Sequence, residues 1–301
     1  MLQAIRMVTL CAPDLDAAER AYVDWLGYEV AGRGRVDEGL AGFWQAPRAE
    51  GSRMVCLRSP VSPGFTLRCI ERPATPGHAT LMTHGWNANE ILVEDPTALA
   101  LRFAGAGSPF RVIGPPEPLA SNPAIVAMQA LGPADELCYF TRLPPGGGTF
   151  VKTPARSFVD RTFIVVLGGP SMAAMQAFYR DVLGITVTDS YRSPVGVLQA
   201  AHGLPSGATT PLALAPLPPG FAIELDEYPA TATPRPRREG DLPPGIAMVT
   251  FSSAAAADDD ALTALPWVAP PAPRRGAPYD GRSAGLLHGP AKEWIEVVVG
   301  A

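Results

Sequence analysis

The sequence lacks long apolar runs and any excess of basic residues. No apolar stretch approaches the roughly 20 residues that a membrane-spanning helix needs, and the N-terminal residues lack the basic, apolar and small-residue succession of a signal peptide. Lys and Arg number 24 against 29 Asp and Glu, which gives a formal net charge of −5 and no basic stripe to meet phosphates. We therefore expect a cytoplasmic protein that binds neither membranes nor nucleic acid.

Cysteine is also scarce. The four cysteines, Cys11, Cys56, Cys69 and Cys138, all lie in the first 150 residues, and none belongs to a CxxC motif. This number and spacing suit neither a disulfide framework in so long a chain nor a cysteine metal site. We expect buried or half-buried free thiols in a reducing compartment.

What the chain does contain is an internal repeat. The phrase DLDAAERAYVDWLGYEV at residues 14–30 returns as SMAAMQAFYRDVLGITV at residues 171–187. A second phrase, GPADELCYF at residues 132–140, returns as GPAKEWIEV at residues 289–297. Both pairs are offset by 157 residues. A repeat of this length predicts a tandem duplication.

The duplication predicts two halves, residues 1–150 and 157–301, joined by a linker that includes the Pro- and Gly-rich stretch 144–148. Each half shows the same order twice: a strand, a helix and further strands. Asp14 is a good N-cap, and the apolar residues after it recur at helical spacing until Gly27. The predicted modules span about residues 1–78, 79–150, 157–236 and 237–301.

The apolar runs between turn residues predict the following elements. The expected strands cover residues 5–10, 28–30, 42–45, 53–57 and 66–71, then 89–93, 110–113, 125–131 and 137–142, then 162–167, 186–189, 195–200, 211–215 and 222–225, and finally 247–252, 285–288 and 294–298. The expected helices cover residues 14–26, 96–103 and 171–183 and a segment around 258–265.

The phrase IRMVTLCAPDLDAAERAYVDWLGYEV at residues 5–30 resembles the opening of a module of the vicinal oxygen chelate superfamily. That superfamily includes glyoxalase I, bleomycin-resistance proteins and extradiol ring-cleaving dioxygenases. All four modules share the pattern, so the resemblance covers nearly the whole chain. It implies an α+β fold of four βαβββ modules, paired into two open barrel-like halves. It leaves open whether modules pair within a half or across halves.

The resemblance also implies where a metal would be held: by a residue early in the first strand of a module, often His, and by one in the last strand, often Glu. The first-strand places fall on Met7, on Asn87 or Ala88, on Ile164 and on Met248. The last-strand places fall near Arg68 and on Tyr139, Glu224 and Glu296. Because no first-strand place holds histidine, we expect no metal. The alternative is Fe, Mn or Zn held by ligands displaced by a residue or two.

Two carboxylates stand out among the candidate catalytic residues. Glu224 and Glu296 each interrupt an otherwise apolar strand, where a buried carboxylate costs free energy unless it is paired or protonated. Mutual repulsion would raise one pKa and create an acid–base pair. The alternative is that strand alternation turns both carboxylates toward solvent. His288 and Tyr139 are the candidate acids.

A polar and aromatic cluster, GWNANE, opens the second module. Trp86, Asn87 and Asn89 from this cluster, together with Gln129 from another apolar strand, are the candidate substrate-binding residues. The alternative is that these side chains pack in the core or in turns.

These residues favour a lyase or isomerase that transfers protons on a small aromatic or carbonyl compound. The sequence leaves open whether the protein is a homodimer. One alternative is a binding protein that sequesters an apolar aromatic ligand. The other is a metal-dependent extradiol-type dioxygenase with displaced ligands.

Overall fold

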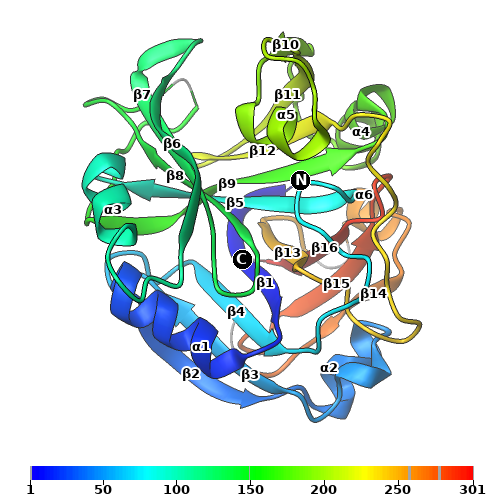
Figure 1. Ribbon diagram of the computed structural model, residues 1–301. Coiled ribbons are helices and arrows are strands. Elements are labelled where there is room, and N and C mark those ends of the chain that lie inside the picture. The colour runs from blue at the N-terminus through cyan, green and yellow to red at the C-terminus, as the bar shows by residue number, and fades with distance from the viewer. Residues whose placement is uncertain (1, 149, 257–258, 277–278, 301) are drawn as a thin grey trace.

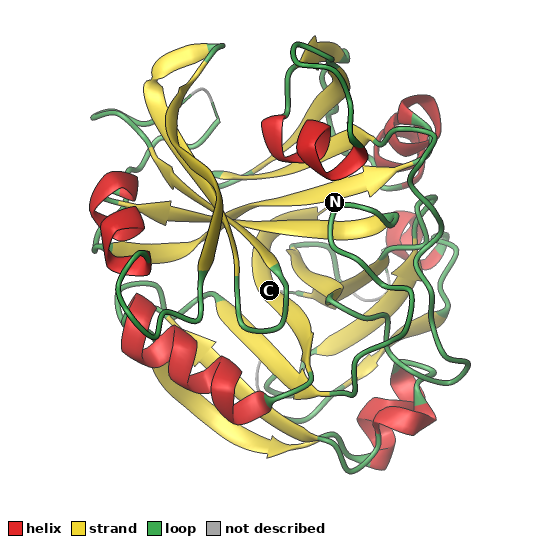
Figure 2. Ribbon diagram, viewed as in Figure 1, coloured by secondary structure: helices red, strands yellow, loops and turns green. Residues whose placement is uncertain are grey.

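Two eight-stranded sheets pack against each other (Figure 1). The structure is a computed structural model that describes residues 2–148, 150–256, 259–276 and 279–300. One large apolar core fills the space between the sheets, and smaller apolar clusters lie against the opposite, concave faces. The helices surround the sheets (Figure 2). This arrangement confirms the expected α+β fold of two open barrel-like halves.

The first sheet is built from the first and fourth modules. It contains β1 (Leu2–Ala12), β2 (Glu29–Arg35), β3 (Arg53–Arg58), β4 (Thr66–Glu71), β13 (Ile246–Ser253), β14 (Ala269–Pro273), β15 (Ser283–His288) and β16 (Trp294–Val299). The strand order is β14-β15-β16-β13-β1-β4-β3-β2. The two modules meet where β1 pairs antiparallel with β13, and each module places its first strand parallel to its last.

The second sheet repeats this arrangement with the second and third modules. It contains β5 (Gly85–Val93), β6 (Arg111–Leu119), β7 (Asn122–Leu131), β8 (Leu137–Arg142), β9 (Val159–Gly169), β10 (Tyr191–Ser193), β11 (Thr210–Leu217) and β12 (Phe221–Glu227). The strand order is β10-β11-β12-β9-β5-β8-β7-β6. Its central contact is the antiparallel pair of β5 and β9.

The modules therefore pair across the two halves of the sequence, which the sequence alone leaves open. The first module joins the fourth, and the second joins the third. Neither sheet coincides with residues 1–150 or with residues 157–301, because each sheet takes one module from each half. Residues on the third and fourth modules consequently lie in different sheets.

Each module contributes a helix after its first strand. These helices are α1 (Leu15–Arg20) with its π-helical extension η1 (Ala21–Trp25), α3 (Pro96–Phe103), α4 (Met172–Ala177) with its π-helical extension η3 (Phe178–Val182), and α6 (Asp260–Thr263). As expected, Asp14 caps the first helix: its carboxylate accepts a hydrogen bond from the Ala17 N–H at 2.9 Å. Of the helix expected around residues 258–265, residue 258 lies outside the described residues.

Two expected strands are wrong because they lie in short helices. Residues 42–45 overlap α2 (Glu38–Phe43), and residues 195–200 overlap α5 (Gly196–His202). A brief apolar run does not reveal by periodicity whether it is a buried strand or a helix. Side chains of α2 and α5 complete the apolar clusters on the concave faces of the first and second sheets. Tertiary packing therefore decides their conformation.

Two further differences occur at sheet edges and turns. The strand expected at residues 186–189 is wrong, because β10 begins only at Tyr191. The edge strand β14 was not expected, because its sequence, APPAP, is rich in proline, which cannot donate a backbone hydrogen bond. A 3-10 turn, η2 (Pro47–Ala49), follows α2.

The four cysteines are buried free thiols, as the sequence predicts. Burial raises the pKa of Cys11 to about 12, which keeps this thiol protonated. The helices within the described residues include none whose length and apolar character would let it cross a membrane.

The repeated phrases preserve two buried hydrogen bonds between the sheets. The Tyr22 hydroxyl donates to Oε1 of Glu136 at 2.9 Å, and 157 residues later the Tyr179 hydroxyl donates to Oε1 of Glu293 at 3.1 Å. Tyr22 lies in η1 beside the first sheet, and Glu136 lies in the turn before β8 of the second sheet. Tyr179 lies in η3 beside the second sheet, and Glu293 lies in the turn before β16 of the first sheet. Burial raises the pKa of both glutamates to about 7. The sheets are thus joined by two related polar contacts.

We predict that Tyr22→Phe and Tyr179→Phe each lower the free energy of unfolding by about 1–3 kcal/mol, because a buried carboxyl loses its donor. Urea denaturation measures this change. The control is Tyr191→Phe, in which an exposed hydroxyl is removed and the expected change is below about 0.5 kcal/mol. Equal stability of all three variants and the parent would contradict a joining role for the two bonds.

Candidate functional site

Carboxyl groups gather on the concave face of the second sheet. Glu90 on β5 lies in register with Tyr139 on β8, and Glu224 extends from β12 on the other side of β9. All three side chains line one cavity of about 180 Å³, together with Gln129 of β7 and Tyr191 of β10. The turn before α5 and the start of that helix complete the cavity wall. In Figure 1, α5 and β10–β11 stand above β12 and β9.

A third carboxyl lies behind this cavity. Asp226 follows Glu224 by two residues, so strand alternation places both on the same face of β12. The Asp226 side chain is buried, and within the described residues its Oδ1 has no hydrogen-bond partner. The Thr141 hydroxyl donates to Oε1 of Glu90 at 2.6 Å. The cluster therefore consists of Glu90, Glu224 and Asp226, with few compensating donors.

Burial and mutual repulsion raise the pKa of every carboxyl in this cluster. Burial, and then the charge of Glu224, raise the pKa of Glu90 to about 8. Burial raises the pKa of Asp226 to about 7, and burial with the neighbouring Asp226 raises the pKa of Glu224 well above its ordinary value. Three carboxylates this close cannot all ionise at neutral pH. The cluster therefore retains protons there, and it titrates as a unit.

No basic side chain lines this cavity within the described residues. Burial raises the pKa of Tyr139 well above its ordinary value, so its hydroxyl stays protonated and can donate a hydrogen bond. The cavity thus offers exchangeable protons, a phenol and the Gln129 amide to a ligand, and it repels anions.

The corresponding face of the first sheet carries a buried ion pair. Nη2 of Arg68 lies 3.7 Å from Oε1 of Glu296, and both side chains are at most 1% exposed. Glu296 accepts hydrogen bonds from Thr250 Oγ1 at 2.7 Å, Trp44 Nε1 at 3.0 Å and the Tyr279 hydroxyl at 2.9 Å. These three donors and the guanidinium surround the Glu296 carboxylate, which thereby ties β16 to its neighbours.

Arg68 is equally well enclosed. Its Nε donates to Oγ1 of Thr9 at 3.0 Å, its Nη1 donates to the Tyr279 hydroxyl at 2.9 Å, and its guanidinium carbon lies 4.6 Å from the Trp44 ring centre. In the cleft beyond Arg68, about 550 Å³ in volume, basic side chains outnumber acidic ones. The basic ones are Arg6, Arg33, Arg35, Arg58, Arg275 and Arg282, against Asp37 and Asp280.

The residues at the superfamily's metal-holding places do not fit a metal ion. In the first sheet, the Arg68 guanidinium stands where a cation would have to lie against Glu296, and Met248 Sδ is 3.5 Å from Arg68 Nη2. In the second sheet the places supply oxygen atoms and no imidazole. No three His, Cys, Asp or Glu side chains within the described ranges are grouped so that they could hold a metal.

Three of the sequence-predicted site residues meet in the second-sheet cavity: Glu224, Tyr139 and Gln129. Glu296 does not join them, because it lies in the other sheet. The proposed pairing of Glu224 with Glu296 is therefore wrong, since it assumed that the third and fourth modules share a cavity.

His288 is also apart from this cavity. Its ring stacks on Trp294 with 5.0 Å between the ring centres, in a small pocket that also contains Arg237 and Lys292. Burial, Arg237 and Lys292 lower the pKa of His288 to about 4. The imidazole is therefore neutral near pH 7 and does not serve as the acid expected from the sequence.

The polar cluster of the second module holds the backbone instead of lining the cavity. Trp86 Nε1 donates to the Trp294 carbonyl at 2.8 Å, across the contact between the sheets. Asn89 accepts a hydrogen bond from the Thr162 hydroxyl, and Asn87 Nδ2 donates to the Thr83 and Gly85 carbonyls. The alternative of core packing and turns describes all three residues.

Sequence reasoning missed Glu90 and Asp226. Glu90 is the one charged residue in a strand that is buried along its whole length, which is a signal available from the sequence GWNANEILV. Asp226 follows Glu224 at the two-residue spacing that puts both on one face. Both signals require knowing which face of the strand is concave.

Neither a scan of protein-family models nor a search of curated proteins gave a match. Solved structures do match. Glyoxalase I from Zea mays aligns with a TM-score of 0.62 at 14% identity, over 99% of this chain and 92% of that one. A proposed dioxygenase from Bacillus subtilis aligns with a TM-score of 0.61 at 12% identity, over 99% and 86%. At these identities the likeness shows the fold alone. It confirms the fold that the resemblance implied.

We predict that Glu296→Gln lowers the free energy of unfolding by about 3–5 kcal/mol, because Arg68 would stay buried without its counter-charge. Thermal and urea denaturation measure this loss. A variant as stable as the parent would show that the ion pair is dispensable.

Glu224→Gln should have the opposite effect. The pKa of Glu224 is raised in the folded state, so its stabilising protonated form is lost as pH rises through that pKa. A neutral amide in its place does not ionise. The variant should therefore be more stable than the parent at pH 9, with the difference shrinking as the pH falls toward 5. An unchanged or inverted pH dependence in urea denaturation would contradict the repulsive cluster.

Proposed function

We propose that this chain, which has the fold of the vicinal oxygen chelate superfamily, is an enzyme of the lyase or isomerase kind. It acts by proton transfer on a small aromatic or carbonyl compound, in the cavity of the second sheet. The observation that supports this proposal is that Glu90 and Glu224 line one cavity with Asp226 close to Glu224 on the same face of β12, and that the pKa values of all three carboxyls are raised. General acid–base catalysis is most effective when the pKa lies near the working pH.

The charge and size of the cavity favour a small neutral substrate. With no basic lining side chain among the described residues, an anionic substrate would meet only repulsion from the carboxyl cluster. The volume of about 180 Å³ accommodates one ring-sized molecule, since a dry cavity of about 150 Å³ already holds benzene. Val195, Val197 and Leu212 supply apolar contacts to such a ring.

The roles follow from position. Glu224 lines the cavity, with Asp226 two residues further along the same face of β12. In its ionised form, Glu224 takes a proton from a carbon next to the substrate carbonyl. Tyr139 donates a hydrogen bond to the substrate oxygen, where negative charge develops. Glu90, protonated at neutral pH, returns a proton to a second atom. One proton is removed and one is delivered, so the overall reaction is an isomerisation, or an elimination if a leaving group departs with the returned proton.

We predict that Glu224→Gln lowers kcat by about 100-fold or more, because the base is removed from the cavity. Turnover should first be sought with a panel of neutral aromatic and carbonyl compounds. Glu117→Gln, an exposed glutamate on β6, is the matched control and should keep full activity. The pH profile of kcat/KM should rise through about 7 and fall above about 8, following the pKa values of Asp226 and Glu90. Unchanged turnover in Glu224→Gln would remove the proposed role.

A binding protein for an apolar aromatic ligand is the second candidate, favoured by the apolar side chains that α5 and the preceding turn place over the cavity. Tight ligand binding without any product in a mass-spectrometric assay would support sequestration over catalysis. Elemental analysis of the purified protein separates both from metal-dependent ring cleavage. Stoichiometric Fe, Mn or Zn would overturn the metal-free proposal.

A further inference from the structure

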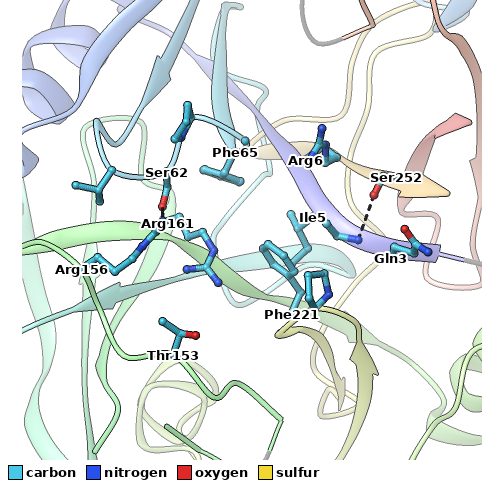
Figure 3. A pocket seen from close by; sticks show the side chains of 15 residues that line it. Gln3, Ile5, Arg6, Ser62, Phe65, Thr153, Arg156, Arg161, Phe221 and Ser252 are labelled. Atoms are coloured by element: carbon cyan, nitrogen blue, oxygen red, sulfur yellow. Dashed lines mark hydrogen bonds between the residues drawn. The ribbon is translucent and has the colours of Figure 1, made fainter. Parts of the chain in front are cut away.

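A second cavity lies at the seam between the two sheets, away from the carboxyl cluster (Figure 3). Its volume is about 450 Å³, which is within the usual range for small-molecule sites. We call it the seam cavity. Its lining comes from β1 and β13 of the first sheet, from β9 and β12 of the second, and from residues 61–65 and 153–156. It is therefore built by both sheets together.

The seam cavity is cationic. Arg6, Arg156 and Arg161 line it, and no Asp or Glu does so within the described residues. Arg156 and Arg161 contact one carboxylate, that of Asp160, which is fully buried and does not line the cavity. Asp160 already accepts hydrogen bonds from the Ser62 hydroxyl and from the backbone N–H and Nε of Arg156. Asp160 thus contacts two of the three guanidinium groups, and one carboxylate against three arginines leaves an excess of positive charge.

Arg161 is the least satisfied of the three arginines. Its side chain is only 13% exposed, yet its Nη1 lies 3.9 Å from Oδ2 of Asp160, beyond hydrogen-bonding distance. Among the hydrogen bonds of the described residues, none is donated by this guanidinium. Burial lowers the pKa of Arg161. A guanidinium has five N–H donors, and among the described residues no acceptor within hydrogen-bonding distance of the Arg161 guanidinium would compete with an anion.

The rest of the wall is apolar. Ile5, Phe65 and Phe221 point into the cavity from β1, the loop before β4 and β12 (Figure 3). The Arg161 guanidinium carbon lies 5.0 Å from the centre of the Phe221 ring, so the charge and the aromatic surface adjoin. A ligand that satisfied both would carry its negative charge at one end of an apolar body.

We propose that the seam cavity binds a small organic anion, namely a carboxylate attached to an apolar ring. Arg161 and Arg6 would bind the carboxylate, and Phe65 and Phe221 would contact the ring. This site is separate from the proposed active site and has the opposite charge, so the two cavities select different ligands. Its occupation would bridge the two sheets, because the arginines come from β1 of one and β9 of the other.

The test is calorimetric titration of the full chain with benzoate at low ionic strength, with benzamide as the neutral analogue and inorganic phosphate as the simple anion. Benzoate should bind saturably, more tightly than either comparison, and more weakly as salt rises. Arg161→Gln should weaken benzoate binding by about tenfold or more, and Arg6→Gln should weaken it as well. Arg180→Gln is the matched control, because Arg180 also pairs with an adjacent aspartate but lies on an exposed helical surface.

Three results would overturn the proposal: no saturable binding of benzoate at millimolar concentrations, benzamide or phosphate binding as tightly as benzoate, or equal benzoate affinity in Arg161→Gln and Arg180→Gln. Thermal unfolding of each variant confirms that it is folded, and Arg6→Gln keeps the test decisive if Arg161→Gln does not fold. Glu224→Gln should bind benzoate like the parent. Loss of acid–base activity and loss of benzoate binding are thereby separable.

Discussion

Two buried tyrosine–glutamate hydrogen bonds fix how the sheets sit on each other. Tyr22 reaches Glu136, and its repeat Tyr179 reaches Glu293, so each sheet both gives and receives one bond. These bonds link the helical segments beside one sheet to the turns that begin the last strands of the other. Those last strands, β8 and β16, carry Tyr139 and Glu296 onto the concave faces. The tyrosine–glutamate bonds, which both repeats contain, therefore help to position Tyr139 and Glu296, which differ between the repeats.

The two concave faces have diverged in charge while keeping the same backbone plan. In the first sheet, Arg68 and Glu296 neutralise each other and are enclosed by donors and an aromatic ring. In the second sheet, the equivalent places hold Glu224 and Tyr139, and Glu90 and Asp226 add further carboxyls without a cation. A buried charge that is paired is costly to separate from its partner, whereas an uncompensated cluster of carboxyls exchanges protons. The concave face of the first sheet therefore holds a structural ion pair, and the concave face of the second sheet holds the candidate reaction site.

The sequence predicts the fold well because its signals are local. The N-cap Asp14, the helical spacing after it and the two repeated phrases reveal the modules, since each depends on neighbours along the chain. The site is predicted only in part, because Glu224, Tyr139 and Gln129 come together through the pairing of β5 with β9. Nothing local specifies that pairing, so Glu296 was assigned to the wrong partner. Glu90 and Asp226 were missed for the same reason: their face of the sheet is defined by tertiary curvature.

The pairing of β1 with β13 also has a consequence for how the chain is made. Synthesis runs from the N-terminus, and domains usually fold as they emerge. The second sheet has all its strands once β12 has been made, whereas β1 must wait for the final quarter of the polypeptide. The first sheet is thus begun first and completed last. Until β13 is made, the edge of β1 that β13 will cover has unpaired backbone groups that could pair with other strands. A nascent chain stalled after β12 would therefore leave this edge of β1 unpaired.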